Sequence, residues 1–369
     1  MKKVSPGLLV LLLSYISIAS FSAAILAPAL PVIQSVFVLT NSSLEWVVSF
    51  FLIGYVLGQL IYGLLANRFG RILSLRIGLC VYLLGCVICI VCSRYLNYPG
   101  LLFGRFLSGL GSACGLSCTF MFLNELLPPG QAKRSFSYTL ISFTVAIGIA
   151  ALLGGVVTEY LHWYDCFWLL LMHAVLMLYM TQYLPETWVR DKQVCFHSAV
   201  VSFFNAFSNR RLLVFSFVVG GSSMFTYGSS FAAPLFVHSY MNLTPSGYGY
   251  WSLFNTLGML LSACLGSRIL YRFGSYNLIQ VSLAIMLFFL VALCFLVHQS
   301  RASTWLFFLL TGLCNFASGL LYSSASYTAS NSLSNKANSA SVMSFINMAC
   351  ATACVMFLGV SIYHPMLLL

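Results

Sequence analysis

Long apolar runs separated by short polar segments make up most of this chain. A helix needs about 20 predominantly apolar residues to cross a bilayer, so each long run predicts one membrane span. The predicted spans are residues 7–29, 44–66, 72–92, 100–124, 136–158, 164–184, 212–235, 248–270, 277–298, 303–327 and 339–361. The pattern therefore predicts an all-α, polytopic membrane protein. Two six-helix halves would need a twelfth span, which is expected to be missing or truncated because only His364-Pro-Met-Leu-Leu-Leu369 closes the chain.

The composition supports a membrane protein and excludes other classes. Of the 369 residues, 60% are hydrophobic and 6% are charged, whereas a soluble domain carries about 25% charged residues. The net charge of +11 is spread thinly over polar segments, which argues against a nucleic-acid partner. The thirteen cysteines show no zinc-ligand spacing, so we expect neither a metal nor another cofactor.

A short polar turn, Gly63–Arg71, joins the second and third predicted spans. Gly63 and Gly70 would permit a tight turn, and the arginines beside them mark a cytoplasmic loop. A weaker version recurs at Ser267–Gly274, with Arg68 and Arg272 separated by 272 − 68 = 204 residues. This repeat predicts two pseudo-symmetric halves, as in many transporters, with a conformational latch at each turn. The predicted latch residues are Gly63, Asn67, Arg68, Gly70, Arg71, Arg272 and Gly274.

The charged residues also predict an orientation. With a cytoplasmic N-terminus, Arg94 and Arg301 lie outside and Arg105 lies within a span, which leaves 17 − 3 = 14 basic residues on the cytoplasmic side. The expected domains are an N-terminal six-helix bundle (1–186), a cytoplasmic linker (187–211) and a C-terminal bundle of five helices plus a stub (212–369). All six acidic residues are expected at helix ends or in loops, which counts against the simplest form of proton coupling.

The Gly63–Arg71 segment resembles the loop motif of the major facilitator superfamily. Other motifs make the chain similar to the Bcr/CflA drug-resistance branch: Leu26-Ala-Pro-Ala-Leu-Pro31, Gly54-Tyr-Val-Leu-Gly-Gln59, Gly104-Arg105-Phe-Leu-Ser-Gly-Leu-Gly111, Gly154-Gly155, Leu184-Pro-Glu-Thr187, Ala233-Pro234 and Phe254-Asn255. The resemblance implies a bacterial inner-membrane transporter that works by alternating access. Three positions depart from the pattern. Asn67 and Ala24 stand where acids are expected, and Ala150-Ala151 replaces a Gly-Pro pair.

Arg105 is the most distinctive candidate for a functional residue. A guanidinium inside a membrane span is unfavourable by several kcal/mol unless it faces a cavity or has partners. The resemblance places such an arginine beside the central cavity, where an anionic substrate is one candidate partner. The structural alternative is an arginine that is satisfied by backbone carbonyls or by the dipole of a neighbouring helix.

Other polar and aromatic residues inside the spans are candidates for a substrate site. They are Phe225, Tyr227, Phe231, Asn255, Asn315, Tyr322 and Asn347, and the alternative for the amides is hydrogen bonding between helices. Gly148, Gly154 and Gly155 are expected to act as a helix hinge or to permit close contact with the eighth span. His173 is a candidate proton carrier, because histidine titrates near physiological pH, although a hydrogen-bonded histidine within the bundle fits as well.

The predicted function is export of small amphipathic compounds by a monomeric, drug-efflux-like antiporter in the lipid bilayer. No phosphate-binding loop is present, so ATP is not expected as the energy source. The spans contain no paired carboxylates, metal cluster or nucleophile–base set, so the chain is not expected to be an enzyme. Two alternatives stay open. One is a transporter of a specific metabolite or siderophore with altered or absent proton coupling, and the other is a truncated membrane protein that does not transport.

Overall fold

The structure, a computed structural model, describes residues 5–127, 129–187, 201, 205–298, 303–333 and 336–361, and every regular element in this part is helical. Many helices begin where the sequence supplies a capping side chain. Thr40 accepts a hydrogen bond from the Ser43 amide, Asn97 from Gly100, and Asn209 from Leu212. Such caps satisfy amides that have no partner within the helix. The predicted all-α fold is confirmed.

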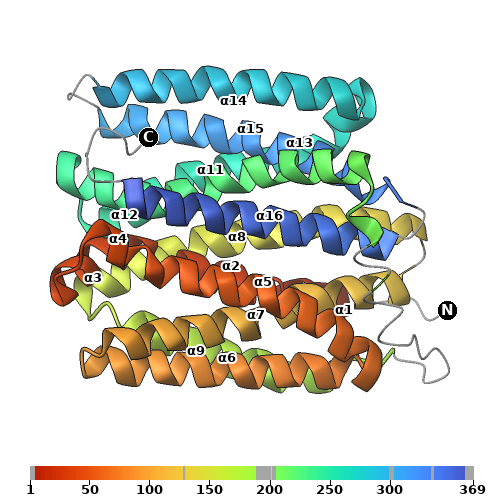
Figure 1. Cartoon of the computed structure of the whole chain (residues 1–369), viewed down its shortest axis with the longest axis horizontal. Helices are drawn as coiled ribbons and strands as arrows, with labels where there is room; N and C mark the ends of the chain where they lie inside the picture. The colour runs from red at the N-terminus through yellow and green to blue at the C-terminus, as the bar shows by residue number, and fades with distance from the viewer. Residues whose placement is uncertain are drawn as a thin grey trace.

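Figure 1 shows the helices as a bundle of long, roughly parallel rods. The N-terminal half, as we call the elements before the linker, comprises α1 (Pro6–Ser14), α2 (Ser17–Ala24), η1 (Ala27–Ala29), α3 (Leu30–Phe37), α4 (Asn41–Leu44), α5 (Trp46–Phe69), α6 (Arg71–Arg94), α7 (Tyr98–Leu126), α8 (Pro129–Tyr160), α9 (Asp165–Met180) and η2 (Thr181–Tyr183). The C-terminal half comprises α11 (Arg210–Met241), α12 (Pro245–Trp251), α13 (Leu253–Phe273), α14 (Ser275–His298), α15 (Thr304–Ser330) and α16 (Lys336–Ser361).

The membrane spans follow the hydrophobic pattern closely. In the described residues, 10 helical segments are long and apolar enough to cross a membrane, and α12 with α13 forms a further crossing from Pro245 to Phe273. The first span continues to Phe37, beyond the predicted end at residue 29. The short 3₁₀ turn η1 contains Pro28, and α3 begins directly after it with Pro31 in its first turn, so the prolines do not end the span. Residues 188–200 and 202–204 lie outside the described part, so the predicted linker, 187–211, and the domain boundaries stay predictions.

The two halves repeat the same packing pattern. In the N-terminal half α7 packs against both α5 and α6, and in the C-terminal half α15 packs against both α13 and α14. Close backbone approach recurs as well. A Cβ at Gly54 would lie 2.2 Å from the Phe106 carbonyl oxygen, and one at Gly258, which is 258 − 54 = 204 residues later, would lie 2.1 Å from that of Gly312. Small residues let membrane helices approach this closely. The predicted repeat is therefore visible in three dimensions.

The turn between α5 and α6 differs in one detail from its prediction. Gly63 was expected to help form the turn, but it lies inside α5, which stays helical to Phe69. Gly70 alone turns the chain, with a φ of 97° that favours glycine, and Gly274 does the same between α13 and α14 with a φ of 76°. We call the end of the bundle that holds Gly70 and Gly274 the Gly70 end, and the opposite end, where α5 begins, the Glu45 end.

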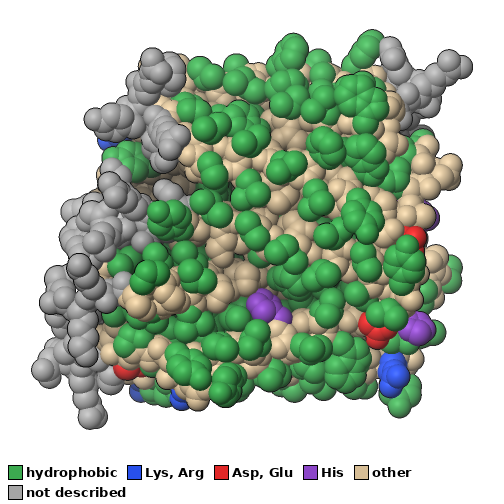
Figure 2. Space-filling model, turned by 180° about the vertical axis from the view of Figure 1, so that it is seen from behind, with side chains coloured by type: hydrophobic (Ala, Val, Ile, Leu, Met, Phe, Trp, Pro, Cys, Tyr) green, Lys and Arg blue, Asp and Glu red, His purple; other side chains and the backbone are tan. Residues whose placement is uncertain are grey.

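The outer surface of the bundle suits a lipid environment. Apolar side chains cover the middle of the face shown in Figure 2, and the charged side chains on that face lie towards its two ends. Large exposed apolar residues include Leu287, Phe288 and Val291 on α14, each at least 60% exposed. A soluble protein rarely exposes so continuous an apolar surface. Together with the span lengths, this distribution shows a multi-pass membrane protein.

Candidate functional site

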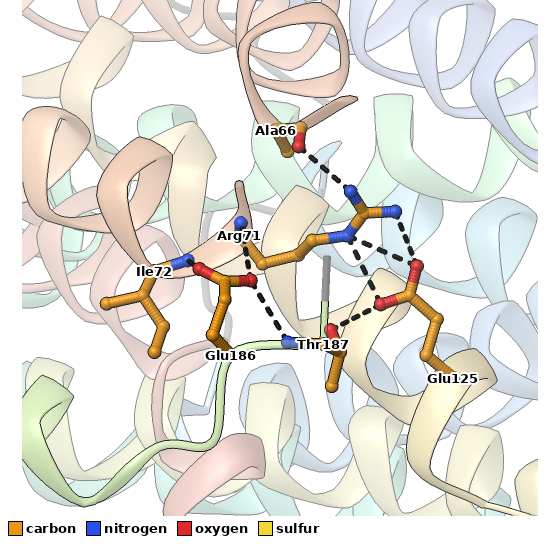
Figure 3. Close-up of polar contacts among 6 residues, drawn as sticks. All are labelled: Ala66, Arg71, Ile72, Glu125, Glu186 and Thr187. Atoms are coloured by element: carbon orange, nitrogen blue, oxygen red, sulfur yellow. Dashed lines mark hydrogen bonds and ion pairs between the residues drawn. The ribbon is translucent and has the colours of Figure 1, made fainter. Parts of the chain in front are cut away.

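A polar network surrounds Arg71 at the Gly70 end (Figure 3). Arg71 Nε donates to both carboxylate oxygens of Glu125 at 3.1 and 3.2 Å, and Nη1 donates to the Ala66 carbonyl at 3.0 Å. Glu186 accepts the backbone amides of Arg71 and Ile72, each at 3.1 Å. The Glu186 carboxylate therefore caps the positive N-terminal end of α6. Arg71 and Glu186 together tie α5, α6, α7 and the segment after η2 into one unit.

The remaining predicted latch residues are only partly placed. Arg68 is exposed and its guanidinium lies 5.3 Å from the centre of the Phe69 ring. The side chains of Asn67 and Arg272 lie outside the described residues. The network around Arg71 lies within the N-terminal half, so a latch between the two halves stays a prediction.

Arg105 is enclosed within the N-terminal half. Its side chain is 1% exposed, and its Nε donates to the Val47 carbonyl at 3.1 Å. Nη1 donates to the carbonyl and the hydroxyl of Ser22 at 3.3 and 3.4 Å, and the guanidinium lies 4.4 Å from the centre of the Phe51 ring. Arg105 thus joins α7 to α2 and α5 through oxygens of the protein. In this conformation the contacts match the structural alternative, and binding of an anionic substrate by Arg105 stays a prediction.

A cluster of tyrosines lies where the two halves face each other. Tyr55 on α5, Tyr227 on α11 and Tyr322 on α15 lie near one another. Gln59 lies one turn from Tyr55 on α5. Asn347 lies on α16, which packs against both α5 and α11. We call Tyr55, Gln59, Tyr227, Tyr322 and Asn347 the central cluster. It combines three predicted site residues with two, Tyr55 and Gln59, that sequence reasoning missed.

Several buried polar atoms of this region lack a well-aligned hydrogen bond. Among the described side chains, Oδ1 of Asn347 is buried without a hydrogen bond. The Gln59 amide lies near Tyr55 and the Ser326 hydroxyl near Tyr322, but neither forms a well-aligned hydrogen bond. Buried polar groups are normally hydrogen-bonded, so such a concentration points to a ligand or water that supplies the missing bonds. In the described part of the chain, the neighbours found for Tyr55 and Tyr227 are each other, Gln59, Cys114 and Tyr322, and none of these side chains is charged. The central cluster therefore offers hydrogen bonds and aromatic surface without charge.

The other predicted binding residues lie elsewhere. Asn255 accepts a hydrogen bond from the Thr311 hydroxyl at 2.8 Å, and Asn315 donates to the Thr311 carbonyl at 2.9 Å. Asn255 thereby joins α13 to α15, as expected for a hydrogen bond between helices, whereas the Asn315 bond stays within α15. Phe231 is 1% exposed and packs into the apolar core of the N-terminal half, whereas Phe225 packs against the C-terminal core. Their contribution to a substrate site stays a prediction.

His173 lies between α9 and α2. Its Nε2 is 3.3 Å from the Ser17 hydroxyl, and its ring centre is 5.4 Å from that of Phe21. Its Nδ1 is buried without a hydrogen-bond partner. Both neighbours belong to the N-terminal half, so His173 makes these contacts within one half. A proton-carrying role for His173 stays a prediction.

The two halves are in close contact at the Glu45 end, along a surface that we call the seam. A Cβ at Gly155 would lie 2.4 Å from the Pro245 carbonyl oxygen, and one at Gly148 would lie 2.6 Å from the Thr256 side chain. These two predicted hinge glycines therefore contact the eighth span, whereas Gly154 approaches Ile25 in the N-terminal half. Glu159 adds a hydrogen bond across the seam, because its Oε2 accepts the Ser246 amide at 2.9 Å.

Glu45 combines an expected position with burial that the sequence did not show. The sequence placed every acid at a helix end or in a loop. Glu45 does precede α5, but its side chain is 1% exposed because α16 covers it at Gly359. In the sequence, Glu45 is an acid directly before the apolar run that begins at Trp46. That pattern does not show which helix covers the side chain.

An apolar groove on the flank is not a candidate substrate site. It has a volume of about 370 Å³ and is lined by Phe217, Val218, Gly221, Leu283, Met286, Leu287, Leu290 and Leu321. Phe217 and Leu287 are about 60% exposed, so the groove opens onto the lipid-facing side. It lacks the convergent polar groups that give a binding site its specificity.

Comparisons with known proteins agree with the architecture. A family model described as Major Facilitator Superfamily matches residues 12–358. A solved D-xylose–proton symporter superposes with a TM-score of 0.77 at 18% identity, over 98% of this chain and 90% of that one. At this identity the likeness concerns the fold alone.

Curated relatives match over shorter stretches. A bicyclomycin resistance protein homolog from Haemophilus influenzae is 22% identical over 246 residues, which cover 64% of this chain and 59% of that protein. A quinolone resistance protein, NorB, from Staphylococcus aureus is 30% identical over 126 residues, which cover 34% of this chain and 26% of that protein. The chain thus spans less than two thirds of the length of these relatives.

Proposed function

The chain belongs to the major facilitator superfamily, a family of transporters and not of enzymes, and we propose that it exports small, uncharged amphipathic compounds by alternating access. In such a mechanism the two halves rock about a midplane site that opens to one side of the membrane at a time. The Gly70 end is cytoplasmic in this proposal, because the basic residues gather there. The membrane is the bacterial inner membrane, and the transporter works as a monomer.

The central cluster carries the proposal. Its members come from both halves, so a ligand bound there would contact both partners of the rocking motion. Gln59 and Asn347 contribute amide groups, and Tyr55, Tyr227 and Tyr322 contribute rings and hydroxyls. Aromatic surface with a few placed hydrogen-bonding groups is typical of sites for small amphipathic molecules. The lack of a charged neighbour favours an uncharged cargo, because a charged ligand would be desolvated without compensation.

Export is favoured over uptake by the names of two relatives, both of which are resistance proteins. The alternative of an anionic metabolite or siderophore needs Arg105 as its anchor. That alternative has less support, because in this conformation the guanidinium already donates hydrogen bonds to three protein oxygens and lies over the Phe51 ring.

Transport by proteoliposomes tests the proposal. Efflux of three radiolabelled probes would be compared: bicyclomycin, which is uncharged, D-xylose, which is uncharged and fully polar, and tetraphenylphosphonium, a lipophilic cation. We expect bicyclomycin to move fastest, and Tyr227→Phe and Gln59→Ala each to slow it by about 5-fold to 150-fold, since each removes a hydrogen bond to cargo worth about 1–3 kcal/mol.

Tyr248→Phe is the matched control, because Tyr248 is also a tyrosine inside the bundle, 6% exposed, but packs against Phe308 within the C-terminal half. It should leave the rate unchanged. Transport of the cation alone, or an equal loss in Tyr248→Phe and Tyr227→Phe, would contradict the assignment of an uncharged cargo to the central cluster.

A further inference from the structure

Glu45 lies in the seam between the two halves. It directly precedes α5, and Figure 1 shows α4 and the start of α5 beside the last turns of α16. A Cβ at Gly359 on α16 would lie 2.0 Å from Glu45 Cγ and 3.0 Å from its Cδ. The glutamate side chain therefore fills the space that the missing side chain of Gly359 leaves. Because α16 belongs to the other half, any motion that opens the Glu45 end must uncover this carboxyl group.

The closed seam holds the carboxyl group away from water and without a cation. Its exposed fraction is 1%, and in the described part of the chain no Lys, Arg or His forms an ion pair with it. The Ser49 hydroxyl, one turn along α5, donates a hydrogen bond to its Oε2. An unpaired buried carboxylate is unfavourable by several kcal/mol. The start of α5 favours a negative charge by only about 0.3–1 kcal/mol, so the neutral acid is the stable form in the closed seam.

Among the described residues, the neighbouring elements supply no titratable group that would change this balance. From α7 the Tyr98 ring is close enough to interact electrostatically with Glu45, and its hydroxyl donates to the Ser43 carbonyl. The α4 segment, Asn41–Leu44, carries no titratable side chain. Among the described side chains of α16 the titratable ones are Cys350 and Cys354, and both contact α11: Cys350 approaches Gly220, and Cys354 Sγ lies 3.6 Å from the Met224 carbonyl.

We propose that Glu45 is a proton-binding site that takes up one proton as the Glu45 end closes and releases it when that end opens. In the closed state the group is a carboxylic acid, and in the open state water solvates the carboxylate and accepts the proton. This site rests on the proposed alternating access, because it needs the two halves to separate. Acidification on the Glu45 side then favours the closed state, and alkalinisation favours the open state.

The neighbouring Glu159 gives a matched control. It also reaches across the seam, but it is exposed and accepts the Ser246 amide, so water and the N-terminal end of α12 stabilise its charge in the closed state. Glu159→Gln removes an exposed carboxylate from the seam and leaves the buried carboxyl group of Glu45 in place. Glu45→Gln keeps the size of the side chain and imitates the neutral acid.

A cysteine reporter measures opening without any cargo. Ala27 is 7% exposed and packs against Ala233, Phe236 and Val237 of the other half, so Ala27→Cys reacts with a membrane-impermeant thiol reagent only when the seam opens. The chain would be placed in nanodiscs, and each rate would be corrected for the parent chain. The rate would then be divided by that of Tyr95→Cys, since Tyr95 is 80% exposed at the same end.

One proton shifts the open-to-closed ratio by at most about tenfold per pH unit, so we expect the normalised rate to rise by about tenfold or more from about pH 5.5 to about pH 8.5. Glu45→Gln should give a low rate at every pH, and Glu159→Gln should keep the pH response. A response that persists in Glu45→Gln, or a flat rate in the parent, overturns the proton site alone. A rate near zero at every pH shows that the seam does not open, which defeats alternating access and the proton site together.

Discussion

Gly155→Ala tests whether the seam sets the balance between closed and open states. The added Cβ would lie 2.4 Å from the Pro245 carbonyl oxygen, whereas ordinary van der Waals contact begins at 3.4 Å. Helices α8 and α12 must therefore move apart by about 3.4 − 2.4 = 1.0 Å in the closed state. The contact atom belongs to the backbone, so no side-chain rotation relieves it. Overpacking of this kind costs about 1–3 kcal/mol.

The open state does not bear this cost, because the two helices belong to different halves. A difference of about 1–3 kcal/mol shifts the ratio of the two states by about 5-fold to 150-fold. Labelling of Ala27→Cys in nanodiscs should rise by that factor in Gly155→Ala at fixed pH. The free energy of unfolding of the N-terminal half should change little, because no contact within that half is disturbed.

Gly154→Ala provides the comparison one residue earlier. Its Cβ would lie 2.0 Å from the Ile25 carbonyl oxygen, which belongs to the same half, so both states are strained alike. We expect a lower thermal midpoint in detergent and no rise in labelling. If the two variants gave the same labelling, or if Gly155→Ala labelled as slowly as the parent, the seam would not control opening.

Two further substitutions test the polar contacts. Arg105→Lys keeps the charge but loses the Nε bond to the Val47 carbonyl, so it should lower the free energy of unfolding by about 1.5–3 kcal/mol. Thermal or denaturant unfolding measures this, and an unchanged midpoint would contradict the role of Arg105 in joining α7 to α5. Arg71→Lys loses the two-oxygen contact with Glu125 at a partly exposed site, so it should lower the free energy of unfolding by only up to about 1 kcal/mol. The difference from the parent should be smaller in high salt, and a difference that does not depend on salt would argue against an ion pair.

The sequence predicts the spans and the repeat well because the bilayer imposes a simple constraint on them. A stretch must be apolar for about 20 residues to cross, and that property is local to the stretch. The turn at Gly70 is also local, since a positive φ favours glycine. Gly63 shows the limit of this reasoning. The residues between Gly63 and Phe69 are compatible with a helix, and the helix continues until Gly70 ends it.

The composition of the central cluster could not be predicted from such local patterns. Tyr55 and Gln59 belong to the motif Gly54-Tyr-Val-Leu-Gly-Gln59, but the motif does not show that Tyr227 and Tyr322 lie near these two residues. Asn255 and Asn315 illustrate the converse case. They are amides within spans, like Asn347, but Thr311 lies between them and satisfies them within one half. Whether an intramembrane amide joins helices or stays free for a ligand depends on which helices pack together.

Glu45 and Glu159 show most clearly what a single sequence leaves undetermined. Both are acids at helix ends next to apolar runs, so hydropathy assigns them the same place near the membrane surface. In the structure, Glu159 stays exposed and is held by the Ser246 amide, whereas Glu45 is covered by α16, whose contact residue Gly359 is 359 − 45 = 314 residues away. That contact exists only in conformations with a closed seam. The difference in solvation between the two acids is therefore a property of the assembled halves, and it is this difference that makes one carboxylate, and not the other, sensitive to opening.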